Sequence, residues 1–136
     1  MSIESFPDLL AKNADWAPGK TALEEVLSGR SVTYGELDDH ASRCAGMLRA
    51  NGVGVGDRVA VLCRNRFEFF ECLFACVRLS AIFVPLNWRM PVPELAPILD
   101  QVKPALCLAG GTEVEALYDA LIGEPVPLVS FDDRSA

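Results

Sequence analysis

The apolar residues of the chain follow two alternating patterns, and each pattern predicts a different kind of element. Short runs that are apolar throughout are typical of strands covered on both faces in a parallel sheet. Such strands are expected at 59–63, 81–86, 105–109 and 126–131. Because both faces of such a sheet must be covered, helices are required between the strands, and the intervening segments have helical spacing.

Five segments are expected to form helices because their apolar residues recur every three or four positions. They are 6–15, 34–51, 65–79, 93–102 and 112–122. The third is apolar around most of its circumference, so it should lie between two layers. The one narrow sector that differs holds Glu68, Glu71, Ala75 and Arg78. In the fourth helix, Pro97 must lie in or near the first turn or kink the helix.

Three helix starts have the spacing of a capping box, in which a polar N-cap side chain and a carboxylate three residues later bind free backbone N–H groups. The pairs are Thr33 with Glu36, Asn65 with Glu68, and Thr112 with Glu115. Glycines at 52 and 123 are expected to end the second and fifth helices.

Upstream of the sheet, 21–27 and 31–34 are expected to pair as antiparallel strands. The three residues between them, Ser28-Gly29-Arg30, have the length and the glycine of a hairpin connection. After this hairpin, helices and strands alternate, with right-handed crossovers expected, and only 132–136 resembles a loose tail. The sequence therefore predicts one α/β domain over 1–136, with a layered, mostly parallel sheet, helices on both faces and an N-terminal β-hairpin.

Composition and charge exclude several classes of protein. The 136 residues are 51% hydrophobic and 23% charged, which excludes intrinsic disorder. The net charge of −7, without a basic patch, disfavours nucleic acid as a partner. Charged residues interrupt the most apolar stretch, 67–86, so no transmembrane segment is predicted. The first residues lack the basic and apolar regions of a secretory signal, and we expect a cytoplasmic protein.

The five cysteines lie mainly in apolar surroundings, and the chain has a single histidine. Neither a disulfide framework nor a zinc site fits this pattern, so the cysteines are interpreted as reduced thiols of the core. Cys72 and Cys76 are four residues apart on a predicted helix, but no further ligands are evident. Packing is the favoured interpretation of this pair, and no metal site is predicted.

Two glycine-rich segments are interpreted as connections and not as phosphate loops: 52–56 as a turn, and 109–112 as a strand-to-helix connection. The segment 52–56 leaves a helix and enters a strand, which reverses the order that brings helix N–H groups to a phosphate. The segment 109–112 follows a strand but lacks the Lys-Ser/Thr pair of such a loop. His40 is expected to form a weak surface pair with Glu36, so no catalytic residue is assigned.

One segment, 83–90, has an unusual composition because Pro85, Asn87, Trp88 and Arg89 follow one another closely at the end of a predicted strand. Ligands of open α/β sheets gather at the carboxyl ends of the strands, where the guanidinium of Arg89 could hold a phosphate. The alternative is an ion pair between Arg89 and Glu94, or plain solvation. Arg89 is the single candidate for cofactor binding.

Three segments, taken in order and spacing, resemble the amino-terminal part of the adenylate-forming, AMP-binding enzymes. They are SVTYGEL at 31–37, GV followed by GDRVAV at 52–61, and VPLNWR at 84–89 followed by PEL at 93–95. The resemblance covers about 7–110 and is strongest to acyl-CoA synthetases for fatty or aromatic acids. Related modules of peptide synthetases usually carry Asp-Pro after VPL, so NWR favours the acyl-CoA ligase branch.

The resemblance implies a reaction that uses ATP, magnesium and CoA. A carboxylate attacks ATP to give an acyl-adenylate and pyrophosphate, and the thiol of CoA then displaces AMP. Magnesium and positive groups neutralise the phosphate charge that develops. The loop that matches 87–89 lies near the entrance for the CoA nucleotide in this family, which implies a CoA phosphate contact for Arg89.

The phosphate loop, the aromatic-Thr-Glu segment, the ribose-binding Asp and the lysine-bearing carboxyl-terminal domain of the family would all follow Ala136. The ATP-binding core and the carboxyl-terminal domain are therefore absent from these 136 residues. We expect the chain alone to be inactive, to bind none of these cofactors tightly, and to associate with the rest of a catalytic domain or with itself through apolar surface. The alternative is an autonomous, non-catalytic interaction module derived from the family.

Overall fold

The computed structural model describes residues 7–132 and shows the expected α/β fold, with five helices and six strands in that range. The elements in chain order are α1 (Leu9–Trp16), β1 (Thr21–Glu24), β2 (Ser31–Thr33), α2 (Tyr34–Ala50), β3 (Arg58–Leu62), α3 (Phe67–Leu79), β4 (Ile82–Pro85), α4 (Val92–Val102), β5 (Leu106–Ala109), α5 (Glu113–Ala120) and β6 (Leu128–Ser130).

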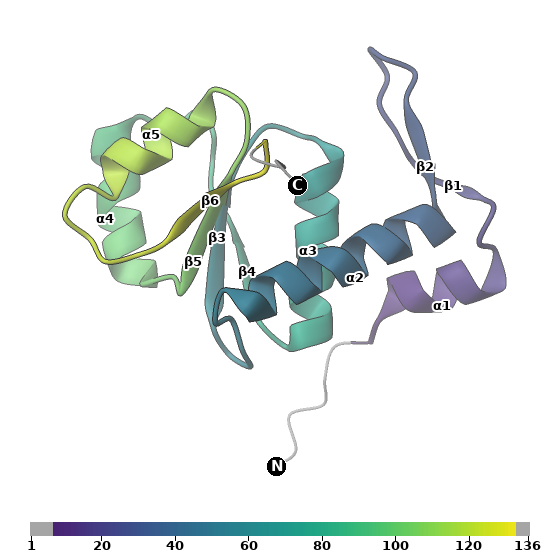
Figure 1. Ribbon diagram of the computed structural model, residues 1–136. Coiled ribbons are helices and arrows are strands. Elements are labelled where there is room, and N and C mark those ends of the chain that lie inside the picture. The colour runs from purple at the N-terminus through teal and green to yellow at the C-terminus, as the bar shows by residue number, and fades with distance from the viewer. Residues whose placement is uncertain (1–6, 133–136) are drawn as a thin grey trace.

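The last four strands form one parallel sheet in the order β4-β3-β5-β6, and β1 and β2 form a separate antiparallel pair. In the sheet, Val59 of β3 lies opposite Phe83 of β4 and Leu106 of β5. Figure 1 shows α2 and α3 on one side of this sheet, α4 and α5 on the other, and the β1–β2 hairpin projecting beyond the start of α2. The fold class is confirmed.

Alternate residues of the central strands supply two separate cores because successive side chains of a strand point to opposite faces. Val59, Val61, Leu106 and Leu108 pack with α2 and α3. Their neighbours Ala60, Leu62, Cys107 and Ala109 pack with α4 and α5. All eight are at most 1% exposed. Full burial of a Val or Leu side chain stabilises a fold by about 1.5–3 kcal/mol, so β3 and β5 carry much of the stability.

A third apolar cluster attaches α1 and the hairpin to the helical layer. Leu10 of α1, Val32 of β2 and Phe67 of α3 are buried against Leu37 and Ala41 of α2. Two charged residues of the narrow sector of α3 face this layer. Glu71 is only 5% exposed, and Arg78 bonds to Asp8, the N-cap of α1, and to Asp38 of α2. The prediction that α3 lies between layers is consistent with this packing.

Only one of the three expected capping boxes forms. Thr33 accepts from the backbone N–H of Glu36, and Glu36 accepts from that of Thr33, so α2 begins as predicted. The helix α3 begins at Phe67 without a side-chain cap, because its N-cap residue is Arg66, whose side chain has no acceptor, and Asn65 lies one residue before that position. Thr112 also makes no cap bond, since its backbone is already helical at φ −69° and ψ −15°. The predictions for Asn65 and Thr112 are therefore wrong.

The hairpin connection is longer than predicted. β1 ends at Glu24, so the connection to β2 spans the six residues 25–30, and not three. The backbone N–H groups of Glu25 and Gly29 donate to Arg30 and Glu25, respectively, which closes the turn. Val26 and Leu27, expected in a strand, are 91% and 98% exposed at its tip.

Two helices also differ from their predicted starts. The helix α4 begins at Val92, so Pro97 lies in its interior, where it cannot donate a backbone hydrogen bond to the preceding turn. The helix α1 begins at Leu9 because Asp8 caps it by accepting from the N–H of Ala11, and the predicted start at Phe6 lies outside the described residues. No helix within residues 7–132 is long and apolar enough to cross a membrane.

Candidate functional site

The loops that follow β3, β4, β5 and β6 form what we call the carboxyl edge, residues 63–66, 86–90, 110–113 and 131–132. All four strands are parallel, so their carboxyl ends lie at the same side of the sheet. Ligands of open α/β sheets bind in this position. Three arginines belong to the carboxyl edge: Arg64, Arg66 and Arg89.

Arg64 and Arg89 both lie over the indole ring of Trp88. Their guanidinium carbons are 4.2 Å and 4.8 Å from the ring centroid. Such cation–π contacts contribute about 0.5–1 kcal/mol at exposed sites. Arg64 also donates from Nε to Oε1 of Glu113 at 3.0 Å, so the loops after β3, β4 and β5 are joined through side chains.

Within residues 7–132, Arg66 forms more ion pairs than Arg64 and Arg89, the other two arginines of the carboxyl edge. Its Nε donates to Glu68 and its Nη2 to Asp132, each at 2.9 Å, and its guanidinium lies 5.9 Å from the Phe131 ring centroid. The Arg66 hydrogen bond and one from the Gly111 N–H, at 2.7 Å, lower the pKa of Asp132. Arg66 therefore ties the β3 and β6 loops together and serves the fold.

Asp132 and Gly110 both lie close to Arg66 and leave its guanidinium little room to move. The sequence interpretation placed Asp132 in a loose tail, which is wrong because Arg66 and Gly111 bind its carboxylate; residues 133–136 lie outside the described range. A Cβ on Gly110 would lie 2.3 Å from Nη1 of Arg66, so a side chain there would force the guanidinium to move.

Arg89 differs from Arg66 because its guanidinium contacts an aromatic face and, among the described residues, no carboxylate. The residue is exposed, and within residues 7–132 it forms no ion pair with Glu94, the alternative considered from the sequence. Its backbone N–H donates to Oδ1 of Asn87 at 3.0 Å, which closes the turn after β4. The N–H groups of the Arg89 guanidinium are thus available to an anionic ligand.

Cys63 is the one thiol at the carboxyl edge, and it is buried. Burial raises its pKa to about 11, with the nearby Arg66 opposing the shift only partly. A thiol is nucleophilic only as the thiolate, so Cys63 is a packing residue at neutral pH.

His40 lies away from the partner that the sequence suggested. Its Nδ1 is 3.1 Å from Oε1 of Glu71, across the contact between α2 and α3, and Glu36 is engaged in the cap of α2. The predicted pair with Glu36 is wrong because the helix packing presents a buried carboxylate to the imidazole. His40 remains without an assigned catalytic role.

The interpretations of the cysteines and glycines agree with the structure. All five cysteines are thiols; Cys72 and Cys76 are at most 1% exposed, and hydrogen bonds with Cys44 and Cys76 raise the pKa of Cys72. Gly52 and Gly56 adopt φ values of +86° and +77°, as turn glycines do. No group of three His, Cys, Asp or Glu side chains in the described part of the chain could hold a metal ion.

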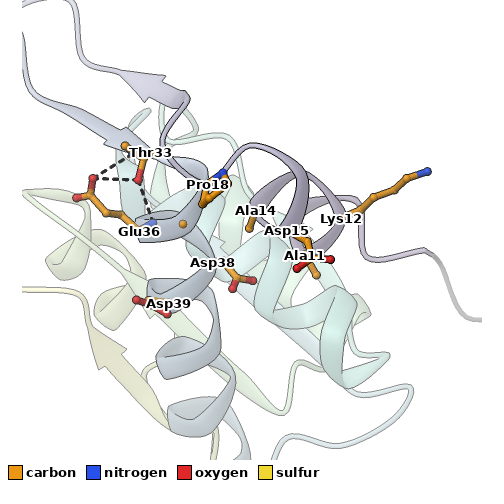
Figure 2. A pocket seen from close by; sticks show the side chains of 10 residues that line it. Ala11, Lys12, Ala14, Asp15, Pro18, Thr33, Glu36, Asp38 and Asp39 are labelled. Atoms are coloured by element: carbon orange, nitrogen blue, oxygen red, sulfur yellow. Dashed lines mark hydrogen bonds between the residues drawn. The ribbon is translucent and has the colours of Figure 1, made fainter.

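A shallow groove of about 870 Å³ lies between α1 and the start of α2, as Figure 2 shows. Its charged residues are Lys12, Asp15, Glu36, Asp38 and Asp39. Four carboxylates against one ammonium repel nucleotide phosphates. Two of these groups are already engaged, Glu36 in the capping box and Asp38 with Arg78. The carboxyl edge is therefore the better candidate for a phosphate-bearing ligand.

Sequence reasoning found Arg89 but missed the residues that surround it. Arg64, Arg66, Glu113 and Asp132 all come within four residues after a strand end. Their position just after a strand end could have identified them, since the same position identified Arg89. Their pairing was hidden because the partners are 49 and 66 residues apart in sequence.

Comparisons with known proteins agree with this geometry. Residues 10–132 match the model of the family described as AMP-binding enzyme. An indoleacetate–CoA ligase of Aromatoleum aromaticum is 37% identical over 89% of this chain and 24% of its own length. The long-chain-fatty-acid–CoA ligase FadD13 of Mycobacterium tuberculosis is 31% identical over 88% of this chain and 24% of its own. The chain thus spans about a quarter of the length of these relatives.

The structural comparison extends the match to the fold. The N-terminal domain of FACL13 from Mycobacterium tuberculosis superposes with a TM-score of 0.84 and 29% identity, over 91% of this chain and 32% of that one. The resemblance to the amino-terminal part of acyl-CoA synthetases, which the SVTYGEL and VPLNWR segments suggested, is confirmed. The chain belongs to the family of AMP-binding enzymes.

Proposed function

We propose that this chain forms the amino-terminal α/β part of an ATP-dependent acyl-CoA synthetase. In the first half-reaction, a carboxylate attacks the α-phosphorus of ATP, which forms an acyl-adenylate and releases pyrophosphate. In the second, the sulfur of CoA attacks the acyl carbon, and AMP leaves. The family match over residues 10–132 and relatives named as CoA ligases support this activity over a non-catalytic interaction module.

One observation supports a role for this chain in CoA binding: the exposed guanidinium of Arg89 at the carboxyl edge. Trp88 supports the guanidinium from one side, and its N–H groups meet no carboxylate of the described chain. A phosphate of CoA matches these donors in charge and in geometry. A hydrogen bond between charged groups contributes about 1.5–3 kcal/mol, or about ten- to a hundredfold in affinity.

The other cofactors of the reaction are ATP and magnesium. CoA supplies the thiol that accepts the acyl group, and this chain contributes Arg89 toward its phosphates. No residue of the chain is assigned to magnesium or to ATP, because the segments that match the family include neither its phosphate loop nor its ribose-binding Asp. We therefore propose that the chain alone neither forms an acyl-adenylate nor binds these cofactors tightly.

Exposed apolar side chains favour contacts with further protein. Trp16, Val26, Leu27 and Val55 are each at least 83% exposed, and three of them lie on α1 or on the hairpin turn. Such side chains favour association with the rest of a catalytic domain or with a second copy. The five thiols fit a reducing compartment, and we propose that the protein acts in the cytoplasm.

The test compares the isolated chain with a completed enzyme, in which this chain replaces the matching segment of FadD13. The assay measures acid-dependent pyrophosphate release and formation of the CoA thioester with fatty and aromatic acids. We expect thioester formation by the completed enzyme and no pyrophosphate release by the isolated chain. A well-folded completed enzyme that forms no thioester with any acid, beside active FadD13, contradicts the proposal.

A further inference from the structure

The three loops at one half of the carboxyl edge are connected by a chain of side-chain contacts that begins at a buried carboxylate. Glu113, in the first turn of α5, has a side chain that is only 9% exposed. It accepts from Nε of Arg64, whose guanidinium lies over Trp88, and the same indole supports Arg89. Each link joins a different loop to the next, so the contacts cross from β5 to β3 to β4.

We propose that Arg64 is a positioning residue that fixes the indole of Trp88 and thereby presents the guanidinium of Arg89 to the CoA phosphate. This inference rests on the proposed function for its ligand, but the contact between Arg64 and Trp88 can be tested without any ligand.

Arg64 is unusually exposed for a residue whose guanidinium makes two side-chain contacts. Its side chain is 63% exposed, and an exposed arginine normally keeps many rotamers. Here the Glu113 carboxylate fixes Nε at 3.0 Å and the indole covers the guanidinium plane. Both contacts constrain the same planar group, so Arg64 restricts the positions that Trp88 can take.

The loop that carries Trp88 and Arg89 needs such a restraint. It is joined to the sheet at Leu86, whose N–H donates to the Val61 carbonyl, and its turn is closed only by short-range bonds. Trp88 is half-buried against the α4 and α5 side of the sheet. Without Arg64, the Trp88 indole would still pack against the α4 and α5 side of the sheet, but it would lose the contact of the Arg64 guanidinium with its ring.

The competing role for Arg64 is direct contact with the phosphate. In that case Glu113 would compete with the ligand for the guanidinium, and removing its charge would leave CoA affinity unchanged or raise it. If Arg64 acts through Trp88, loss of the Glu113 charge weakens the restraint and lowers CoA affinity. Lower CoA affinity of Glu113→Gln therefore supports the positioning role, and unchanged or higher affinity overturns it.

The first experiment uses the isolated 136-residue chain and the fluorescence of Trp88. Trp16→Phe removes the other tryptophan, which is 85% exposed and outside the carboxyl edge. In this background, Arg64→Ala is expected to raise the Stern–Volmer constant for acrylamide about twofold, because part of the ring cover of Trp88 is removed. An unchanged constant with an intact circular dichroism spectrum overturns the proposal.

A matched control for this experiment is Arg30→Ala. Arg30 also places its guanidinium over an aromatic ring, 4.5 Å from the centroid of Phe67, but it belongs to the hairpin and not to the carboxyl edge. The Arg30→Ala variant should leave the quenching of Trp88 unchanged. An equal change in both variants would show a general loosening of the fold and would overturn the specific role of Arg64.

The second experiment measures CoA affinity in the completed enzyme. Arg64→Ala is expected to weaken apparent CoA affinity about three- to tenfold, with a smaller effect on the adenylation half-reaction. Adding it to Arg89→Ala should cause little further loss, because a positioning residue has no effect once its target is gone. Losses that multiply in the double variant overturn the positioning role, and so does CoA binding that is unchanged or tighter in Glu113→Gln.

The two experiments separate this inference from the proposed function. A completed enzyme that forms no thioester rejects the function, and the quenching of Trp88 then still decides whether Arg64 fixes the indole. Arg64→Lys also distinguishes the two roles of Arg64, because it keeps the charge but loses the planar guanidinium and the Nε donor to Glu113. Its CoA affinity should resemble that of Arg64→Ala if Arg64 positions Trp88, and affinity near that of the parent enzyme overturns the positioning role.

Discussion

Two arginines, Arg78 in the helical layer and Arg89 at the carboxyl edge, differ in how their donors are used. Arg78 donates from Nε to Asp8 at 2.8 Å, from Nη1 to the Asp38 carbonyl at 3.0 Å and to the Ser42 hydroxyl at 2.8 Å, and from Nη2 to the Asp38 carboxylate. Arg89 contacts the Trp88 ring and its guanidinium binds no carboxylate of residues 7–132.

The difference separates an arginine that holds the fold from one that is available to a ligand. The Arg78 side chain is 15% exposed, and its partners come from α2 and the N-cap of α1. Loss of the guanidinium would remove the cation shared by the Asp8 and Asp38 carboxylates. The hydrogen-bond and ring contacts of the exposed Arg89 within residues 7–132 stay inside its own loop, with the Trp88 ring and with Asn87.

The largest expected effect on stability is that of Arg78→Ala. It leaves two carboxylates without their cation and should cost about 2–3 kcal/mol, near the lower end for a buried ion pair because Asp8 and Asp38 remain about one third exposed. Arg89→Ala should change stability by no more than about 1 kcal/mol, the contribution of an exposed cation–π contact such as that with Trp88. Urea unfolding followed by circular dichroism measures both, and equal losses would contradict the comparison.

A smaller effect is expected at the helix starts of the same two regions. Thr33→Ala removes the cap of α2 in the helical layer and should cost about 1 kcal/mol. Thr112→Ala, at the carboxyl edge, should cost much less because Thr112 caps nothing. The same urea measurement applies to both, and a loss at Thr112 as large as that at Thr33 would show an unrecognised role for its hydroxyl.

The smallest expected effect is the pH dependence contributed by Asp132. Its pKa is lowered by the Arg66 hydrogen bond and the Gly111 N–H, so the ionised form stabilises the fold. This stability is present above the ordinary value of 3.8 and is lost as the pH falls through the lower pKa of the folded state. The side chain is 50% exposed, which limits the contribution to under about 1 kcal/mol.

Asp132→Asn provides the check on this pH dependence. The variant should be slightly less stable than the parent chain at pH 7, and the difference in unfolding free energy should shrink as the pH falls below 3.8. A difference that stays constant down to acid pH would mean that packing, and not the charge of Asp132, ties the β6 loop to Arg66.

The sequence predicts best what depends on neighbouring residues. The cap of α2 was found because Thr33 and Glu36 are three residues apart, and β3 because its apolar run is continuous. The contacts of His40 with Glu71 and of Arg64 with Glu113 join residues 31 and 49 positions apart, which no local pattern contains. A local pattern also failed at Asn65 and Glu68, because the helix begins one residue later than they predict, with Arg66 at the N-cap.

The most direct test of the central claim is the CoA affinity of Arg89→Ala in the completed enzyme, measured beside the rate of acyl-adenylate formation. Loss of a charge-assisted phosphate contact predicts about ten- to a hundredfold weaker CoA binding, with adenylation damaged far less. Unchanged CoA dependence, or equal damage to both half-reactions, would contradict the assignment of the carboxyl edge to the CoA phosphate.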